Sequence, residues 1–147
     1  MQSLSPLDGR YAHTVDALRP FFSEDALIKA RIIVEVRYLS ALADEKGIPE
    51  LRPFGSREKK ALQKLVDDFG PAEAEKVRQI EKTTNHDVKA VEYYLRTQLK
   101  KIGGAKMRHE FIHFALTSED VNNVAYGILI TDAIRTVLLP ELRAVIA

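Results

Sequence analysis

Apolar residues recur with helical spacing along most of the chain. In "ALIKARIIVEVRYLSALADEK" they cover much of the circumference of a helix, and Ser23 before two acids is a typical N-cap. Gly47 and Pro49 provide the stop, so this segment predicts one long helix. The next segment, "REKKALQKLVDDF", carries one narrow apolar stripe between Ser56 and Gly70. It predicts an amphipathic helix at the surface.

Two further helices are expected before the middle of the chain ends. Pro71 suits the first turn of "PAEAEKVRQIEKTT", and either Asn85 or Asp87 can cap "VKAVEYYLRTQLKKI", which Gly103 and Gly104 then stop. Signals for β-strands are almost absent. The fold class predicted from these patterns is therefore all-α.

The last part of the sequence predicts a short helix followed by a long one. "KMRHEFIHFAL" has a helical pattern that ends at Thr117 and Ser118, and Thr117 with Asp120 resembles a capping box. The following residues carry an apolar stripe at every fourth position: Val121, Ala125, Leu129, Ala133 and Val137. Further apolar residues broaden this stripe, as in a helix packed inside a bundle or an oligomer: Val124, Ile128, Ile130, Ile134 and Leu138.

The pattern of this long helix also bears on domain organisation. Pro140 is expected to kink or restart the helix, and the sequence still has a helical pattern when it reaches Ala147. We therefore expect a helical amino-terminal domain over residues 1–107, followed by the start of a truncated helical-bundle domain over residues 108–147. The chain is expected to be a fragment of a longer one.

Composition narrows the class of protein. The 147 residues include no cysteine, which excludes disulfides and thiolate metal sites. There are 22 basic and 21 acidic residues, so no overall field favours nucleic acid or a membrane surface. The longest apolar run, residues 124–130, is too short to cross a bilayer, and no leader peptide is evident. We expect a soluble, cytoplasmic protein whose anion sites, if any, are local.

One short pattern suggests metal chemistry. His109, Glu110 and His113 follow H-E-x-x-H, which on a helix is typical of zinc proteases. Such a site needs a continuous helix and a third ligand, and neither Glu119 nor Glu141 is well placed to be one. A zinc hydrolase is thus a disfavoured alternative. In the structural alternative, His109 and Glu110 lie at the surface and His113 is a packed or hydrogen-bonded histidine.

In that structural alternative the neighbouring apolar residues form part of the core: Phe111, Ile112 and Phe114.

The segment from residue 93 to 108 contains basic residues and no acid. These basic residues are Arg96, Lys100, Lys101, Lys106 and Arg108. A solvated helix end is the preferred interpretation of this run. A non-catalytic helical module that binds a partner or nucleic acid is the alternative.

Three other segments suit the binding of an anion. "SPLDGRY" presents Arg10 beside Tyr11, and an arginine fork with a phenol suits a phosphate or carboxylate. Thr117 and Ser118 place two hydroxyls at a helix amino end, where free N–H groups favour an anion. An ordered arm and simple capping explain these residues equally well.

The third segment is "TTNHDVKAVEYY". It places His86 just before a helix start, and histidine is the side chain best suited to proton transfer near neutral pH. A purely structural interpretation, with Asp87 as N-cap, is favoured when this segment is taken alone.

Taken together, "SPLDGRY", "TTNHDVKAVEYYLR" and "FIHFALTSEDVNN" resemble, in order and spacing, the adenylosuccinate lyase family. This family belongs to the fumarase, aspartase and argininosuccinate lyase superfamily, and the resemblance covers nearly the whole chain. It implies elimination of fumarate from adenylosuccinate, giving AMP, and from the succinyl-carboxamide intermediate of purine synthesis. It also implies a homotetramer that needs no metal or organic cofactor.

The resemblance further implies roles for individual residues. Arg10 and Tyr11 are expected to bind the nucleotide phosphate, and Thr117 and Ser118 the carboxylates of the succinyl group. His86 is expected to assist catalysis near the reacting region. Asn85, His86 and Asp87 together should line the substrate pocket. The family's general acid, a histidine, and its base, a serine, have no counterpart in these 147 residues, so this fragment alone is expected to be inactive.

Overall fold

The computed structural model describes residues 3–102 and 108–147. All regular structure in these residues is helical, which confirms the all-α class. The elements in chain order are η1 (Asp16–Leu18), α1 (Arg19–Phe22), α2 (Glu24–Asp44), α3 (Ser56–Asp67), α4 (Pro71–Thr84), α5 (Asp87–Ile102), η2 (Arg108–Phe111), α6 (Ser118–Ala133), η3 (Ile134–Leu138) and α7 (Leu139–Ile146). No described helix combines the length and apolar character that a membrane-spanning segment needs.

Helix α2 is the central element. It begins as predicted, with the Ser23 hydroxyl accepting the N–H of Ala26 at 3.2 Å. Helices α3, α4 and α5 pack against one side of α2 and enclose the main core, in which Ile32 and Leu39 are almost completely buried. The apolar stripe of α3 faces this core, so the predicted amphipathic surface helix is confirmed.

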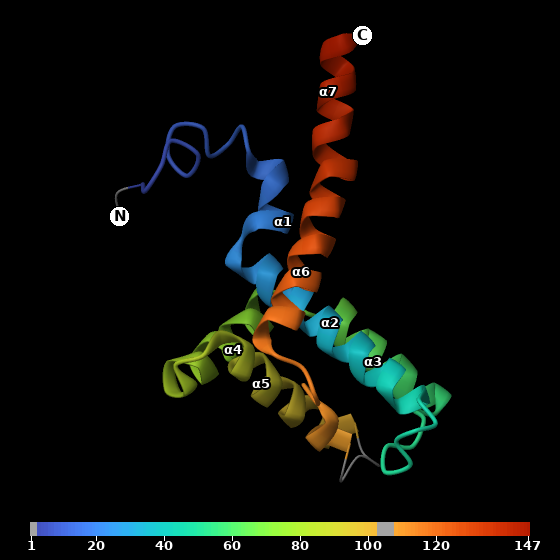
Figure 1. The fold of residues 1–147 in the computed structure, drawn as a ribbon. Coiled ribbons are helices and arrows are strands. Elements are labelled where there is room, and N and C mark those ends of the chain that lie inside the picture. The colour runs from blue at the N-terminus through green and yellow to red at the C-terminus, as the bar shows by residue number, and fades with distance from the viewer. Residues whose placement is uncertain (1–2, 103–107) are drawn as a thin grey trace.

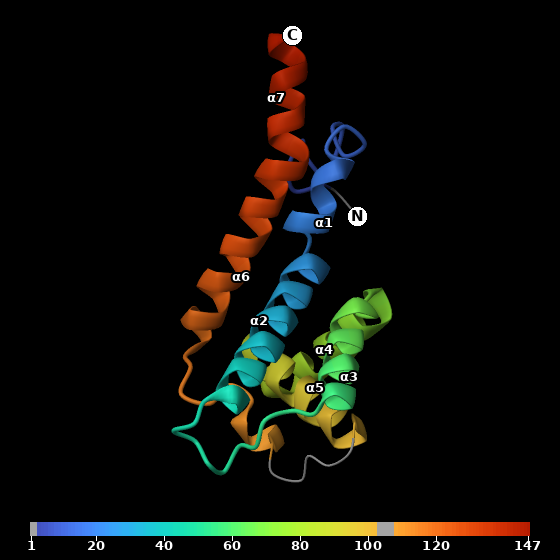
Figure 2. The same cartoon turned by 90° about the vertical axis from the view of Figure 1, so that its right-hand side faces the viewer.

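Helix α6 packs along another part of α2, as Figures 1 and 2 show. Small residues line the contact, since Ala26 and Ala30 of α2 meet Ala125 and Leu129 of α6. The predicted stripe is buried from Val121 to Ala133, and small side chains allow the two helix axes to approach closely. The expected packing face of this helix is therefore confirmed.

The rod formed by α6, η3 and α7 continues past this contact and projects from the rest of the molecule (Figure 1). The wide turn η3 precedes Pro140, and the Leu139 N–H donates to the Ile134 carbonyl, five residues earlier. Proline lacks an N–H and crowds the preceding turn. The wider turn accommodates both effects, so the helix continues through Pro140. It does not restart there, which was one of the two expectations.

Two sequence-based boundaries need correction. Ser56 is the first residue of α3, and Gly55 is the N-cap, with its N–H donating to Glu58 Oε2 at 2.8 Å. The short helix predicted over "KMRHEFIHFAL" is only the single turn η2, because His113 and Ala115 have left-handed backbone conformations with φ of 61° and 58°. Residues 103–107 of the predicted glycine stop and helix start lie outside the described residues.

The expected core of that short helix is also partly wrong. Ile112 is buried and Phe111 packs against the core, but Phe114 is 46% exposed. The left-handed residues on either side of Phe114 turn its side chain away from the core, toward Phe111, whose ring centroid lies 5.4 Å from its own.

Candidate active site

The turn between α4 and α5 presents the first group of predicted site residues. Asn85 adopts a left-handed conformation, with φ 50° and ψ 34°, and its N–H donates to the Glu81 carbonyl at 2.7 Å to close α4. Asparagine tolerates this conformation better than most residues. His86 then caps α5, since its Nδ1 accepts the N–H of Lys89 at 3.2 Å. The prediction that Asn85 or Asp87 caps α5 is therefore wrong.

This capping hydrogen bond fixes the tautomer of the neutral His86 ring. Because Nδ1 accepts a hydrogen bond, the proton of the neutral imidazole is on Nε2. The side chain is 51% exposed, so the ring is accessible from solvent. The position of His86 is thus compatible with both structural and chemical roles, which use different ring nitrogens.

Asp87 is held by the protein at both of its carboxylate oxygens. Oδ1 accepts the Val88 N–H at 2.8 Å, and Oδ2 accepts from Nη2 of Arg31 at 2.6 Å. Burial raises the pKa of Asp87, but the Val88 N–H and the Arg31 charge outweigh it, so the pKa lies below its ordinary value. Asp87 is an anion at neutral pH and orients the start of α5.

The start of α6 carries the second group of predicted residues. Thr117 and Asp120 form the predicted capping box: the Thr117 N–H donates to Asp120 Oδ2 at 2.7 Å, and Thr117 Oγ1 accepts the Asp120 N–H at 3.4 Å. The Thr117 N–H and hydroxyl hold the pKa of Asp120 below its usual range. The hydroxyl of Ser118 has no protein partner within the described part of the chain. Ser118 thus presents a donor at the positive end of a helix.

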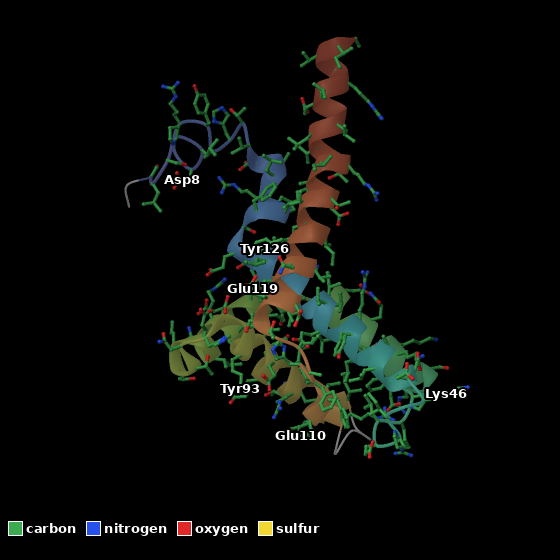
Figure 3. The ribbon with its side chains drawn as sticks, in the orientation of Figure 1. Asp8, Lys46, Tyr93, Glu110, Glu119 and Tyr126 are labelled. Atoms are coloured by element: carbon green, nitrogen blue, oxygen red, sulfur yellow. The ribbon has the colours of Figure 1, made fainter. Side chains whose placement is uncertain are left out.

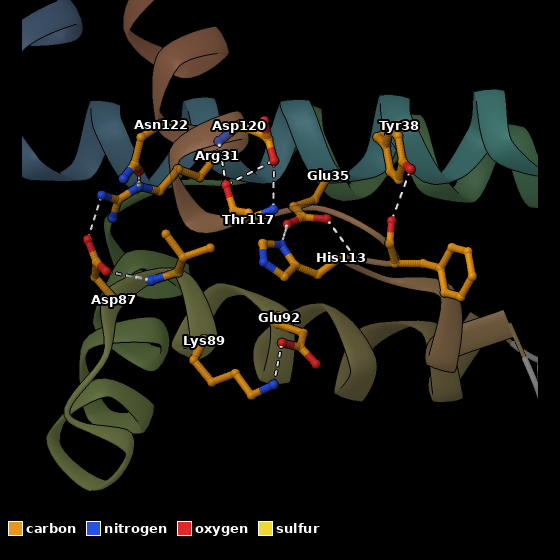
Figure 4. Close-up of polar contacts among 12 residues, drawn as sticks. Arg31, Glu35, Tyr38, Asp87, Lys89, Glu92, His113, Thr117, Asp120 and Asn122 are labelled. Carbon is orange, nitrogen blue, oxygen red and sulfur yellow. Dashed lines mark hydrogen bonds and ion pairs between the residues drawn. The ribbon is translucent and has the colours of Figure 1, made fainter.

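Arg31 of α2 joins these two helix starts. Its Nη2 donates to Asp87, and its Nε donates to Asn122 Oδ1 in α6 at 2.9 Å (Figure 4). The structure therefore brings the segment of Asn85, His86 and Asp87 into the same region as that of Thr117 and Ser118. Sequence reasoning missed Arg31, although the place of this charged residue among apolar ones, between Ala30 and Ile32, was a signal that it has a buried partner.

Glu35, one turn further along α2, was missed for the same reason. It is 1% exposed, and its two oxygens bind one residue: Oε2 accepts the His113 N–H at 3.1 Å, and Oε1 lies 2.6 Å from His113 Nδ1. Burial raises the pKa of Glu35, and the contacts with His113 offset only part of this effect. Glu35 thereby fixes the loop that leads into α6.

The geometry removes the basis of the zinc hypothesis. His109 lies on the single turn η2, with Nε2 3.0 Å from Glu110 Oε1, whereas the His113 ring faces Glu35 across a left-handed turn. The continuous helix that the H-E-x-x-H pattern requires is absent from residues 108–116. Within residues 3–102 and 108–147, no group of three histidine or acidic side chains is arranged to bind a metal ion.

Arg10 and Tyr11 lie in an amino-terminal arm that folds on itself. The Tyr11 N–H donates to the Pro6 carbonyl at 2.9 Å, and the Arg10 guanidinium stacks 4.5 Å from the Tyr11 ring centre and bonds its hydroxyl. Figure 3 shows this arm, marked by Asp8, well away from the start of α6, marked by Glu119. The structure of one chain therefore does not bring Arg10 and Tyr11 to the other predicted residues.

The basic run is not one solvated face. Arg96 binds the buried Glu92 at 2.9 Å, and Arg108 is 8% exposed and binds Glu58 at 2.7 Å. Lys106 lies outside the described residues. Arg108 thus joins η2 to α3, and Arg96 also pairs with Glu110 of η2 at 3.3 Å, which leaves the lysines at the end of α5 as the solvated part of the run.

Comparison with known proteins identifies the family. A family model described as lyase matches residues 9–147. The chain belongs to this lyase family. The match includes every residue of the predicted site, from Arg10 to Ser118.

Curated proteins that are similar in sequence to this lyase chain carry the name adenylosuccinate lyase. Those of Legionella pneumophila (strain Corby) and Escherichia coli (strain K12) are 43% identical over 145 and 146 residues, and each alignment covers 99% of this chain. That of Dictyostelium discoideum is 40% identical over 148 residues and 97% of the chain. The chain spans about a third of their length, 32%, 32% and 31% respectively.

Proposed function

We propose that this chain is part of an adenylosuccinate lyase. The enzyme eliminates fumarate from adenylosuccinate to give AMP, and from the succinyl-carboxamide intermediate of purine synthesis to give its carboxamide. The observation that carries the proposal is the 40–43% identity to proteins of that name in bacteria and in Dictyostelium discoideum, over almost every residue of the chain.

The geometry at the two helix starts supports this chemistry. The substrate carries a phosphate at one end and two carboxylates at the other, so its site needs anion donors. Ser118 and the free N–H groups of α6 supply them for a carboxylate, where negative charge develops after proton removal. The Nε2–H of His86 is the donor that assists at the reacting region, and Asn85 beside it lines the pocket.

The separation of the arm supports a site assembled from several subunits. Arg10 and Tyr11 are proposed to bind the nucleotide phosphate, but in one chain the arm that carries them, marked by Asp8 in Figure 3, lies apart from the start of α6, marked by Glu119. In a cytoplasmic homotetramer, the arm of one subunit completes the site of another. The division into a helical domain over residues 1–107 and the start of a bundle domain over residues 108–147 belongs to the same proposal.

The test is a fumarate assay on the full-length enzyme that contains these residues. We expect turnover of adenylosuccinate, with no turnover of argininosuccinate or malate, the substrates of related superfamily members. Residues 1–147 alone should release no fumarate, because the general acid and base of the family are not among them. Turnover of argininosuccinate or malate in place of adenylosuccinate would contradict the substrate, and fumarate release by residues 1–147 would contradict the assignment of acid and base.

A further inference from the structure

Two charged side chains of α2 are buried, whereas others in the same helix, such as Lys29 and Arg37, are not. Arg31 is 5% exposed and Glu35 is 1% exposed, and their spacing of four residues places them on the same face of the helix. Removing a charge from water is costly unless its partners compensate. The identity of these partners therefore shows what the two residues hold in place.

The partners of Arg31 come from two helix starts that are distant in the sequence. Asp87 is 56 residues away and directly follows His86, whereas Asn122 is 91 residues away in the first turns of α6. A guanidinium is planar, so its Nε and Nη2 donors point in fixed directions. Arg31 consequently fixes the start of α5 relative to the start of α6.

Glu35 acts on the loop that enters α6. One carboxylate holds both the backbone N–H and the ring of His113, and this residue has a left-handed conformation. Tyr38, almost one turn further along α2, donates its hydroxyl to the Phe114 carbonyl at 2.9 Å. Figure 4 shows these contacts along one side of α2, with the loop and the start of α6 lying across it.

We propose that Arg31 and Glu35 are positioning residues of the lyase site, which set the separation and orientation of His86 and Ser118 without touching the substrate. The proposal rests on the proposed function. It assigns α2 the role of a template: Arg31 sets the distance between two helix starts, and Glu35 sets the angle at which the chain enters α6. A displacement of about 1 Å at such groups lowers turnover on the order of a hundredfold.

The decisive variant is Arg31→Lys in the full-length enzyme, because lysine keeps the charge but cannot direct two donors along fixed lines. At a temperature well below the melting transition, we expect kcat to fall on the order of tenfold or more, while the tetramer and the helical circular dichroism are retained. The matched control is Arg78→Lys. Arg78 of α4 also bonds α2, through Asp25, and pairs with Glu75, but none of these partners belongs to the candidate site. The Arg78→Lys variant should lower the melting temperature and leave kcat unchanged.

A second pair of measurements separates positioning from stability. Arg31→Lys combined with Asp87→Asn should lower kcat by less than the product of the two single effects, since both changes break the same contact. Glu35→Gln keeps an acceptor for the His113 N–H but loses the charge that faces the ring, and it should lower kcat more than it raises KM.

The outcomes distinguish the two proposals. An unsubstituted enzyme that does not cleave adenylosuccinate overturns the proposed function. An active enzyme in which Arg31→Lys and Glu35→Gln both keep kcat within about twofold overturns the positioning role. Loss of the folded assembly in both variants would assign the two residues to stability alone, and it would overturn the positioning role as well.

Discussion

His86 has a capping role in the fold and a proposed role in the site, on one imidazole ring. Nδ1 accepts the N–H of Lys89 and caps α5, while the side chain as a whole is half-exposed. The sequence indicated His86 as a candidate site residue, but it did not indicate that this histidine caps α5. Asn85 and Asp87 are better N-cap residues by type, and the left-handed turn at Asn85 removes that residue from the cap position.

His86→Ala in the full-length enzyme should lower kcat on the order of a hundredfold or more, because it removes the Nε2–H donor. It also removes the cap, so the matched variant is His86→Asn, which restores a capping acceptor without the ring. We expect His86→Asn to regain thermal stability but not kcat, as measured by fumarate release and thermal denaturation. Recovery of kcat in His86→Asn would limit His86 to a structural role.

Arg10→Ala in the full-length enzyme should instead raise KM, with a smaller effect on kcat.

Glu35 gives the fold an unusual dependence on pH. Its pKa is raised by burial above the ordinary value of 4.5, so the folded state retains this proton to a higher pH than the unfolded state. From pH 4.5 up to the raised pKa, the folded state binds more protons, and the free energy of unfolding contributed by Glu35 falls as pH rises. His113 and Glu92 are the titratable groups that act on it most directly.

Glu35→Gln should therefore remove this negative slope, and the free energy of unfolding should decline less as the pH rises from 4.5 to the raised pKa of Glu35. Urea denaturation at several pH values measures it, with the exposed Glu50→Gln as control, which should leave the pH profile unchanged. A Glu35→Gln profile parallel to that of the unsubstituted protein would show that Glu35 does not titrate differently in the folded state.

At the scale of elements, helix starts were the features that the sequence predicted best. Ser23 and Pro71 begin α2 and α4 as expected, and Thr117 with Asp120 forms the predicted box. Capping depends on residues three positions apart, so local sequence contains the necessary information. The prediction of a short helix before Thr117 was wrong because Glu35, 78 residues earlier in the chain, holds His113 in a left-handed turn.

Thr117→Ala should destabilise the start of α6 by about 1 kcal/mol, because the Asp120 N–H loses its side-chain acceptor. Amide hydrogen exchange in the first turn of α6 should increase accordingly. Thr131→Ala is the matched control, since Thr131 is exposed within the same helix and caps nothing. Equal exchange in Thr117→Ala and Thr131→Ala would contradict the importance of the box.

At the scale of the whole molecule, the projecting rod leaves one apolar surface uncovered. Its exposed large apolar residues are Val124, Tyr126, Ile130, Ile134, Leu138, Leu139, Leu142, Val145 and Ile146. The sequence predicted that this stripe is too broad for a single packing face. The structure shows that the stripe from Val121 to Ala133 is buried, with Ala125 and Leu129 against α2, whereas Ile130 and Leu138 stay exposed.

Residues 1–147 on their own should therefore associate in a concentration-dependent manner, because these exposed apolar side chains favour contact between copies. Light scattering over a range of concentrations measures this. Replacing Ile130 and Leu138 together by lysine should shift the sample toward monomer, whereas Glu141→Lys, a polar change on the same rod, should not. A monodisperse monomer without any substitution would contradict the prediction.

The sequence by itself determined the helical class, the starts of α2, α4 and α6, and the buried stripe of α6, because periodicity and capping involve residues within about four positions of one another. It also supplied the segments that resemble a lyase family. Only the tertiary structure decided that Arg31 pairs with Asp87 and Asn122, that Glu35 holds His113, and that the arm lies apart. These contacts join residues 56 to 91 positions apart, and packing alone selects among the many partners available to a charged side chain.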